Sequence, residues 1–157
     1  MKTDLTAKDI MTKDVLMAYE GWSIKRLSEF LIKNKISGAP VIASDHSLVG
    51  VVTQSDVVRF ESNSDQEKGR MLQQVYSEFV GLEYDEALQE QMLSQADVNC
   101  TVNQVMTDNV VKIDAKASFQ EVAYVMLQNG IRRIFVTNNG LIEGVISGSN
   151  ILRAIAK

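Results

Sequence analysis

The sequence has very few of the residues that build disulfides and metal clusters. Its 157 residues include one cysteine, Cys100, and one histidine, His46. One cysteine cannot form a disulfide within the chain, and together with one histidine it cannot supply a structural zinc site. Only an all-oxygen metal site is compatible with this count, and we predict no metal-ligating residues. A chain of this length buries roughly 70% of the surface that its unfolded form exposes, so it needs neither a disulfide nor a metal to hold a core.

Long apolar runs and a strong excess of positive charge are also missing. No stretch approaches the ~20 apolar residues that cross a bilayer, and the first residues lack the apolar region of a secretory signal. We therefore expect a cytoplasmic protein that does not bind membranes. Sixteen basic and twenty acidic residues give a net charge of −4, which disfavours nucleic-acid binding through phosphate neutralisation.

What the sequence does contain is an internal repeat, which is best sought before secondary structure. At an offset of 95 residues Met11-Thr12 matches Met106-Thr107, and at an offset of 94 Gly50 matches Gly144. Ser23, Asn34, Ile36 and Val41 match Ser118, Asn129, Ile131 and Val136, while Ser55 and Arg59 match Ser149 and Arg153. We therefore divide the chain into two copies of one unit, residues 7–60 and 101–155.

Each copy predicts the element order β-α-β-β-α. A serine, Ser23 or Ser118, precedes apolar residues at helical spacing and has the character of a helix cap. Asn129-Gly130 is a helix-stopping signal, and Asn138-Asn139-Gly140 is typical of a hairpin turn. The expected strands are 15–17, 39–42 and 48–53 in the first copy and 110–111, 134–137 and 141–147 in the second. The expected closing helices are 55–60 and 149–155.

The segment between the copies, residues 61–99, is strongly acidic, with nine acidic and two basic side chains. Its apolar residues follow helical spacing, which predicts a helical insertion and not a disordered linker. They are Met71, Leu72, Val75, Tyr76, Phe79 and Leu82, continued by Tyr84, Leu88 and Met92. Such a stripe is typical of a core or oligomer face, or of a groove for another protein.

Two equivalent strand-to-helix junctions carry the main chemical signal. Gly50 to Asp56 and Gly144 to Asn150 each end a strand in a hydroxyl residue and begin a helix within three residues. Thr53 and Asp56 have capping-box spacing, so helix capping alone explains them. The same free amides and hydroxyls also form a seat for a phosphate. A neighbouring carboxylate or carboxamide can accept hydrogen bonds from a ribose.

Arg132 and Arg133 lie between the helix and the next strand of the second copy. Arginine binds phosphate through a planar fork, so the pair is a candidate anchor for a polyanion, although such charges are also common at a strand edge. Pro40 and Phe135 occupy equivalent positions. Each could press against a flat base or simply fill the core.

This arrangement resembles the cystathionine-β-synthase (CBS) domain family, whose tandem pairs are called Bateman modules. Three features carry the resemblance: Asp9-Ile10-Met11-Thr12 with its echo Gln104-Val105-Met106-Thr107, the Ile36-to-Val41 segment, and the two junctions. The resemblance implies an α/β (α+β) fold with two repeats packed through their sheets. It also implies dimerisation into a disc, and a regulatory role without catalysis.

The resemblance further implies clefts between the repeats for AMP, ADP, ATP, S-adenosylmethionine or a relative. Asp56 would hold the ribose of one cleft with Thr53 or Ser55, and Asn150 would do so in the other with Ser147 and Ser149. Asn150 departs from the usual acid, so the second cleft could be weaker. The base pockets would be lined by Val15, Pro40, Val41, Val110 and Phe135.

Enzymatic interpretations find little support. The phosphate-binding loops of nucleotide hydrolases and the glycine pattern of dinucleotide enzymes are both absent. We predict no catalytic residues and no catalytic cofactor. The favoured hypothesis is a homodimeric sensor that binds a small nucleotide and signals to an unknown regulated protein. The alternatives are a ligand-free dimerisation scaffold built on the 61–99 helices, and a pocket for another small anion or a metal-nucleotide complex.

Overall fold

A computed structural model of the chain describes residues 4–79 and 86–157. The described chain divides into two compact units. Unit 1 contains the segments up to Leu16, Ser44–Leu48 and Asn109–Lys157. Unit 2 contains Met17–Ala43 and Val49–Asp108. The units therefore do not coincide with the two copies of the sequence repeat.

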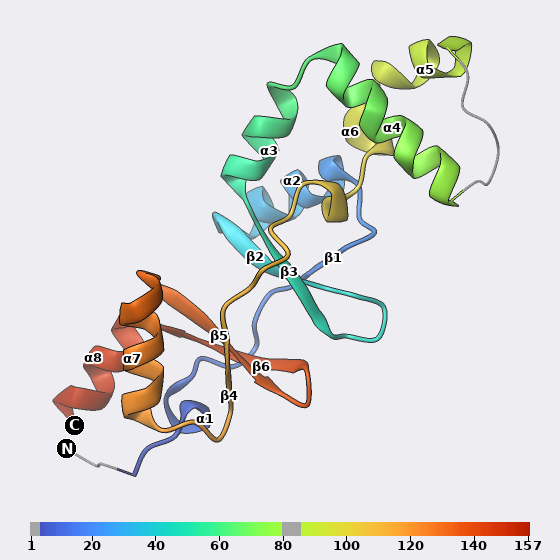
Figure 1. Cartoon of the computed structure of the whole chain (residues 1–157). Coiled ribbons are helices and arrows are strands. Elements are labelled where there is room, and N and C mark those ends of the chain that lie inside the picture. The colour runs from blue at the N-terminus through green and yellow to red at the C-terminus, as the bar shows by residue number, and fades with distance from the viewer. Residues whose placement is uncertain (1–3, 80–85) are drawn as a thin grey trace. The chain divides into compact units, whose positions relative to one another are not determined.

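Unit 1 is a three-stranded sheet with helices packed on it (Figure 1). The strand order is β4-β5-β6, with β4 parallel to β5 and β5 antiparallel to β6. The buried core joins Val122 and Met126 of the long helix to Ile134, Val136 and Ile146 of the sheet. Its elements are α1 (Ala7–Ile10), β4 (Lys112–Asp114), α7 (Phe119–Asn129), β5 (Arg133–Asn138), β6 (Leu141–Ser147) and α8 (Gly148–Ala156).

Unit 2 repeats this plan and adds the insertion. Its sheet has the order β1-β2-β3, with β1 parallel to β2, and its core joins Leu27 and Leu31 to Val41 and Val52. Its elements are β1 (Ala18–Tyr19), α2 (Ile24–Asn34), β2 (Gly38–Ile42), β3 (Leu48–Thr53), α3 (Gln54–Glu61), α4 (Asp65–Phe79), α5 (Glu86–Leu93), α6 (Ala96–Asn99) and a 3₁₀ turn, η1 (Val102–Gln104). The predicted α/β fold is confirmed.

Local signals set most helix and turn boundaries as the sequence predicts. The Ser23 and Ser118 hydroxyls accept hydrogen bonds from the amides of Arg26 and Glu121, and cap α2 and α7. Gly130 ends α7 at a φ of 60°. The hairpin turn between β5 and β6 also uses positive φ angles, 53° at Asn139 and 82° at Gly140.

The first strand of each copy begins later than the sequence predicts. The apolar runs 15–17 and 110–111 precede the strands, which start at Ala18 and Lys112. Only these later residues reach a partner, since Ala18 pairs with Val41 and Lys112 pairs with Phe135. A strand is defined by its ladder partner, which local composition does not specify.

The opening segments of the two copies are exchanged between the units. In unit 1, the amide of Ala7 donates to the carbonyl of Ala117 at 2.8 Å, and Thr12 pairs with Val145. In unit 2, Thr107 pairs in the same way with Val51. The opening segment of the first copy therefore completes the second copy, and the reverse also holds.

The matched glycines explain how these segments dock. A Cβ on Gly144 would lie 2.8 Å from the carbonyl oxygen of Thr12, and a Cβ on Gly50 would lie 2.9 Å from that of Thr107. Both contacts are with backbone, which cannot easily give way. The glycines thus permit the close approach of a second backbone to the sheet.

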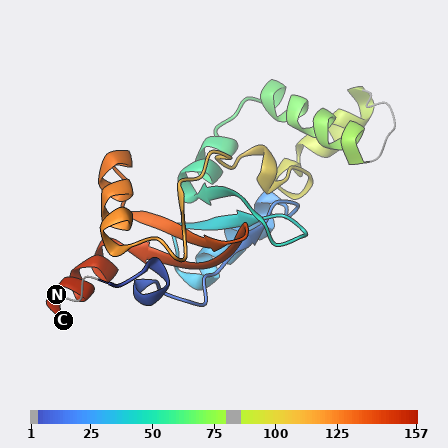
Figure 2. The ribbon, with the colours of Figure 1, turned by 60° about the horizontal axis from the view of Figure 1, so that its bottom comes forward.

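The insertion folds onto unit 2, as its apolar spacing predicts for a core face. Helices α4, α5 and α6 lie together (Figures 1 and 2). Leu72 and Ala96 are buried with Ile24, Phe60 and Cys100 in one apolar cluster. The stripe residues Leu82 and Tyr84 lie outside the described residues.

Candidate functional site

The strand-to-helix junction of unit 2 is a complete capping box. One carboxylate oxygen of Asp56 accepts from the Thr53 amide at 2.8 Å and from its hydroxyl at 3.2 Å. The other oxygen forms an ion pair with Arg59 at 2.9 Å. Asp56 is buried, whereas Ser55 is exposed. The capping function that the spacing predicts is therefore confirmed.

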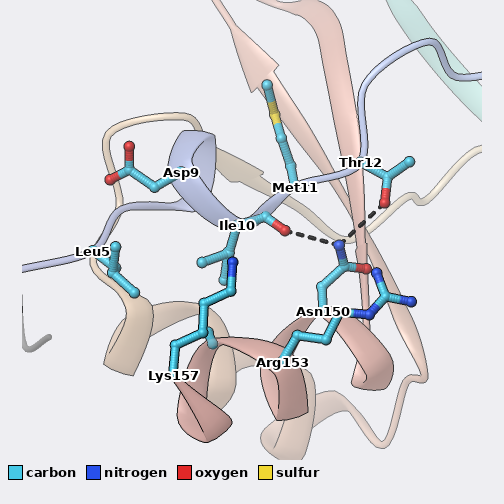
Figure 3. A pocket seen from close by; sticks show the side chains of 9 residues that line it. Leu5, Asp9, Ile10, Met11, Thr12, Asn150, Arg153 and Lys157 are labelled. Carbon is cyan, nitrogen blue, oxygen red and sulfur yellow. Dashed lines mark hydrogen bonds between the residues drawn. The ribbon is translucent and has the colours of Figure 1, made fainter. Parts of the chain in front are cut away.

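The equivalent junction of unit 1 uses a carboxamide differently. The Asn150 oxygen accepts from the Ser147 amide at 2.9 Å and from its hydroxyl at 2.7 Å. Its nitrogen donates to the Ile10 carbonyl at 2.8 Å and to the Thr12 hydroxyl at 3.1 Å (Figure 3). Asn150 thus joins the start of α8 to the exchanged opening segment.

A cavity of about 630 Å³ lies at the same end of the unit 1 sheet. Arg133 begins β5 directly opposite Ser147, the last residue of β6, because the two strands are antiparallel. This register brings four predicted residues, Arg132, Arg133, Ser147 and Ser149, to one cavity. Its remaining lining is mostly apolar: Ala123, Met126, Leu127, Ile131, Gly148, Ile151 and Leu152.

The chemistry of this cavity suits a phosphorylated or otherwise anionic organic ligand. Arg132 and Arg133 are exposed and supply planar cationic donors, while Ser147 and Ser149 supply hydroxyls beside the start of α8, where free amides favour negative charge. The apolar wall can cover a flat or aliphatic group. The volume is within the range of small-molecule sites.

The counterpart positions in unit 2 are less suited to phosphate. Ser37 and Gly38 replace the two arginines. The amide of Gln54, at the start of α3, already donates to the Ser37 carbonyl at 2.8 Å. A Cβ on Gly38 would lie 3.0 Å from the Val52 carbonyl, so this end of the sheet is tightly packed.

The five residues predicted to line base pockets have different environments. Pro40 and Val41 are buried within β2. Val15, Val110 and Phe135 are half-buried, the last within β5. None of the five lines the 630 Å³ cavity.

Sequence reasoning missed Ile10 and Thr12 as partners of Asn150. The motif Asp9 to Thr12 indicates the family, but it does not indicate which copy the segment contacts. An available signal was the change from Asp56 to Asn150, because only a carboxamide can donate a hydrogen bond as well as accept one. A donor at that position indicates an acceptor close by.

The pKa values of Cys100 and Asp9 are shifted by their surroundings. Burial raises the pKa of the Cys100 thiol to about 11, because the thiolate would lose its hydration. Hydrogen bonds from the backbone and side chain of Thr6 lower the pKa of Asp9, which caps α1. Across residues 4–79 and 86–157, no three His, Cys, Asp or Glu side chains gather in a way that could hold a metal ion.

Comparisons with known proteins agree with this architecture. The family model named CBS domain matches residues 7–63 and 102–157. The protein MJ1426 of Methanocaldococcus jannaschii, described as uncharacterized, is 28% identical over 152 residues, which cover 94% of this chain and 89% of that protein. The chain therefore belongs to the CBS domain family and carries a tandem pair of these domains.

Solved structures share the fold. CBSX2 from Arabidopsis thaliana in complex with AMP has a TM-score of 0.67 at 22% identity and covers 97% of this chain and 96% of its own. The CBS domain pair of MJ0100, in complex with 5′-methylthioadenosine and S-adenosyl-L-methionine, has a TM-score of 0.61 at 21% identity and covers 97% and 96%. Within the described ranges, no helix combines the length and apolar character needed to span a bilayer.

Proposed function

We propose that the protein is a regulatory module that binds an adenosine-containing ligand in the unit 1 cavity, without catalysis. Arg132 and Arg133 hold the phosphate of AMP, ADP or ATP, or the anionic end of S-adenosylmethionine. Ser147 and Ser149 donate or accept hydrogen bonds beside them, and the apolar wall covers the nucleoside. The single observation that carries the proposal is the convergence of these four side chains on one cavity of about 630 Å³.

Related structures support the ligand class. CBSX2 has been solved with AMP, and MJ0100 with two adenosine derivatives. These proteins share the fold of this chain, and the cavity in unit 1 contains cations that can bind the phosphate of AMP or the carboxylate of S-adenosylmethionine. Asn150 contributes indirectly, because its hydrogen-bonding atoms are already engaged by Ser147 and the opening segment.

A second site in unit 2 would use Thr53, Ser55 and Asp56. We propose that it is the weaker of the two, the reverse of the expectation drawn from Asn150, because Arg132 and Arg133 line the cavity of unit 1. The Asp56 carboxylate would have to exchange its bond to Arg59 for the ribose hydroxyls. Pro40 and Val41 of the same unit are buried and would support such a pocket from inside. Val15, Val110 and Phe135 belong to unit 1, and their contact with a base stays a prediction. Without counterparts of Arg132 and Arg133, this site favours the nucleoside over the phosphate.

Regulation would follow from differential binding. A ligand shifts a conformational equilibrium only by its difference in affinity for the two states. The ligand in unit 1 lies beside Ser147, whose amide donates a hydrogen bond to Asn150. Asn150 in turn donates to the Ile10 carbonyl and the Thr12 hydroxyl of the opening segment. Occupancy can therefore change how firmly the opening segment is held, and a regulated protein can read that change. We also infer that the protein is a homodimer.

Calorimetric titration with AMP and with adenosine tests this proposal. Replacing both arginines, Arg132→Ala with Arg133→Ala, should weaken AMP binding at least about tenfold, because it removes charge-assisted bonds to the phosphate. Adenosine lacks the phosphate, so its affinity should change little. The matched control is Arg153→Ala, which removes the same charge from unit 1 but does not line this cavity.

The scaffold alternative makes the opposite prediction. A ligand that binds the folded state raises the melting temperature by mass action. If AMP, ADP, ATP and S-adenosylmethionine all leave the melting temperature of the intact chain unchanged, the sensor proposal is wrong. A ligand-free dimerisation module would then be the better account of the fold.

A further inference from the structure

Among residues 4–79 and 86–157, one surface is open in unit 1 and covered in unit 2. In unit 1, α8 and the exchanged opening segment enclose a groove with a volume of about 380 Å³ (Figure 3). We call it the α8 groove, and its lining includes Leu5, Ile10, Asn150, Arg153, Ala154 and Lys157. It does not include the four predicted residues of the nucleotide cavity.

The repeat offsets identify the matching surface in unit 2, which α4 covers. Leu5 and Ala154 correspond to Cys100 and Phe60, and both of these are fully buried in one cluster with Leu72 of α4. Gln104 donates from its side chain to the Met71 carbonyl at 2.8 Å and fastens α4 in place. A helix therefore occupies the unit 2 version of the α8 groove.

The groove in unit 1 is also deeper because of one substitution between the copies. Phe60 fills the centre of the unit 2 surface with an aromatic ring, whereas Ala154 leaves that volume empty. Leu5, Ile10 and Ala154 form an apolar floor. An occupant of the α8 groove must therefore bring a large apolar side chain of its own.

The charges of the two surfaces differ as well. In unit 2, Arg59 is paired with Asp56. Its counterpart Arg153 lies beside the neutral Asn150 and forms no ion pair within the part of the chain that the structure describes. Figure 3 shows Lys157 extending from α8 toward α1. The Asp9 carboxylate points away from Lys157 and accepts a hydrogen bond from the Thr6 amide. Asp9 also lines the groove, so two cations face one carboxylate there and the rim of the α8 groove is net positive.

We propose that the α8 groove docks an amphipathic helix of a partner protein. That helix carries a large apolar side chain over Ala154 and a carboxylate facing Arg153 and Lys157. The helical form of the occupant follows from α4 on the matching surface, and the acidic character follows from charge complementarity. Docking at this surface is separate from nucleotide binding and requires no nucleotide.

Two peptides derived from α4 test the proposal against the intact chain. Both copy residues 64–79 with Leu72→Phe, which supplies the aromatic ring that Ala154 lacks. One also carries Lys68→Glu, because the Lys68 ammonium lies 5.4 Å from the Phe60 ring centre in unit 2, and the counterpart of Phe60 in unit 1 is Ala154, the residue next to Arg153. Fluorescence anisotropy should show that the Lys68→Glu peptide binds at least about tenfold more tightly than the peptide that keeps lysine.

Variants of the chain locate the binding. Arg153→Glu should reverse the preference between the peptides, whereas Lys116→Glu, a charge reversal elsewhere on unit 1, should not. Ala154→Phe should block both peptides by filling the groove. Because Arg153 is exposed, its variant keeps the test valid even if Ala154→Phe impairs folding. Equal affinity for the two peptides, or a preference that Arg153→Glu leaves unchanged, would overturn the proposal.

Discussion

Asp56 and Asn150 occupy the same place in the two copies but form different bonds. Both cap a helix through one oxygen, bonded to Thr53 or Ser147. The second carboxylate oxygen of Asp56 can only accept, and it accepts a hydrogen bond from Arg59 of the same helix. The carboxamide nitrogen of Asn150 can donate, and it donates a hydrogen bond to the Ile10 carbonyl of the opening segment. One chemical change therefore gives the two junctions different partners.

The buried Cys100 leads to a prediction about how stability depends on pH. Its thiol is buried and has a folded-state pKa of about 11, against an ordinary value of 9.0. Because the unfolded chain loses this proton first as pH rises, the contribution of this thiol to the free energy of unfolding should be constant below pH 9 and fall between pH 9 and 11. Urea unfolding across this range measures the effect.

The Cys100→Ala variant provides the control. Because it lacks the thiol, its free energy of unfolding should fall less between pH 9 and 11 than that of the natural chain. At pH 8 the native thiol should react with a disulfide reagent at least about tenfold more slowly than the thiol in urea, because thiolate is the reactive form. Equal rates in the two states would show that the thiol is neither buried nor raised in pKa.

Among secondary-structure elements, those with local signals could be predicted from the sequence. Capping serines, Gly130 and the Asn139-Gly140 turn act through their own backbone, so their elements lie close to the predicted residues. The convergence of Arg132, Arg133, Ser147 and Ser149 could also be anticipated, because a hairpin brings these ends together. The roles suggested for Val15, Pro40, Val41, Val110 and Phe135 stay predictions.

The exchange of opening segments could not be predicted from the sequence. Met11-Thr12 and Met106-Thr107 are nearly identical, and so are the Gly50 and Gly144 surfaces that receive them. Either pairing satisfies the same local chemistry. The choice depends on the path of the chain between distant residues, and periodicity contains no information about that path.

The attachment of the unit 1 opening segment leads to a prediction for Asn150→Asp. Aspartate keeps the cap on Ser147 but cannot donate to the Ile10 carbonyl, so the free energy of unfolding should fall by about 1–3 kcal/mol. Amide hydrogen exchange should also speed up at Thr12, which pairs with Val145. Urea unfolding and exchange measured by NMR check the two effects.

The reciprocal change, Asp56→Asn, serves as the control. It retains an acceptor for Thr53 and loses an ion pair to Arg59, whose side chain is 69% exposed. The expected cost is below about 1 kcal/mol. If Asn150→Asp costs no more than Asp56→Asn, the bonds from Asn150 to the opening segment contribute little to stability.

For the whole molecule, an exposed apolar surface on unit 1 supports the inferred homodimer. Leu127 of α7 and Leu152 of α8 are exposed and line the same cavity. Tyr124 and Ile155 lie about one helical turn beyond them and are 62% and 52% exposed. Adjoining apolar residues of this kind are typical of a surface that another copy covers.

Light scattering should therefore give the mass of two chains for the natural sequence. Tyr124→Glu combined with Ile155→Glu should give the mass of one, because both charges would be buried without partners. Neither residue lines the nucleotide cavity, so AMP binding should persist. Val98→Glu, at an exposed apolar position on α6, should remain dimeric. A natural chain that is monomeric at all concentrations would contradict the inference.

The exchanged opening segments also fix an order of assembly on the ribosome. Unit 2 has all its segments once residue 108 has been synthesised, whereas unit 1 waits for α8 at the end of the chain. The bond between Asn150 and Ile10 joins residues 140 positions apart. We expect unit 2 to fold first, while the opening segment of the first copy, with Ile10 and Met11 uncovered, is incorporated only after α8 has been synthesised.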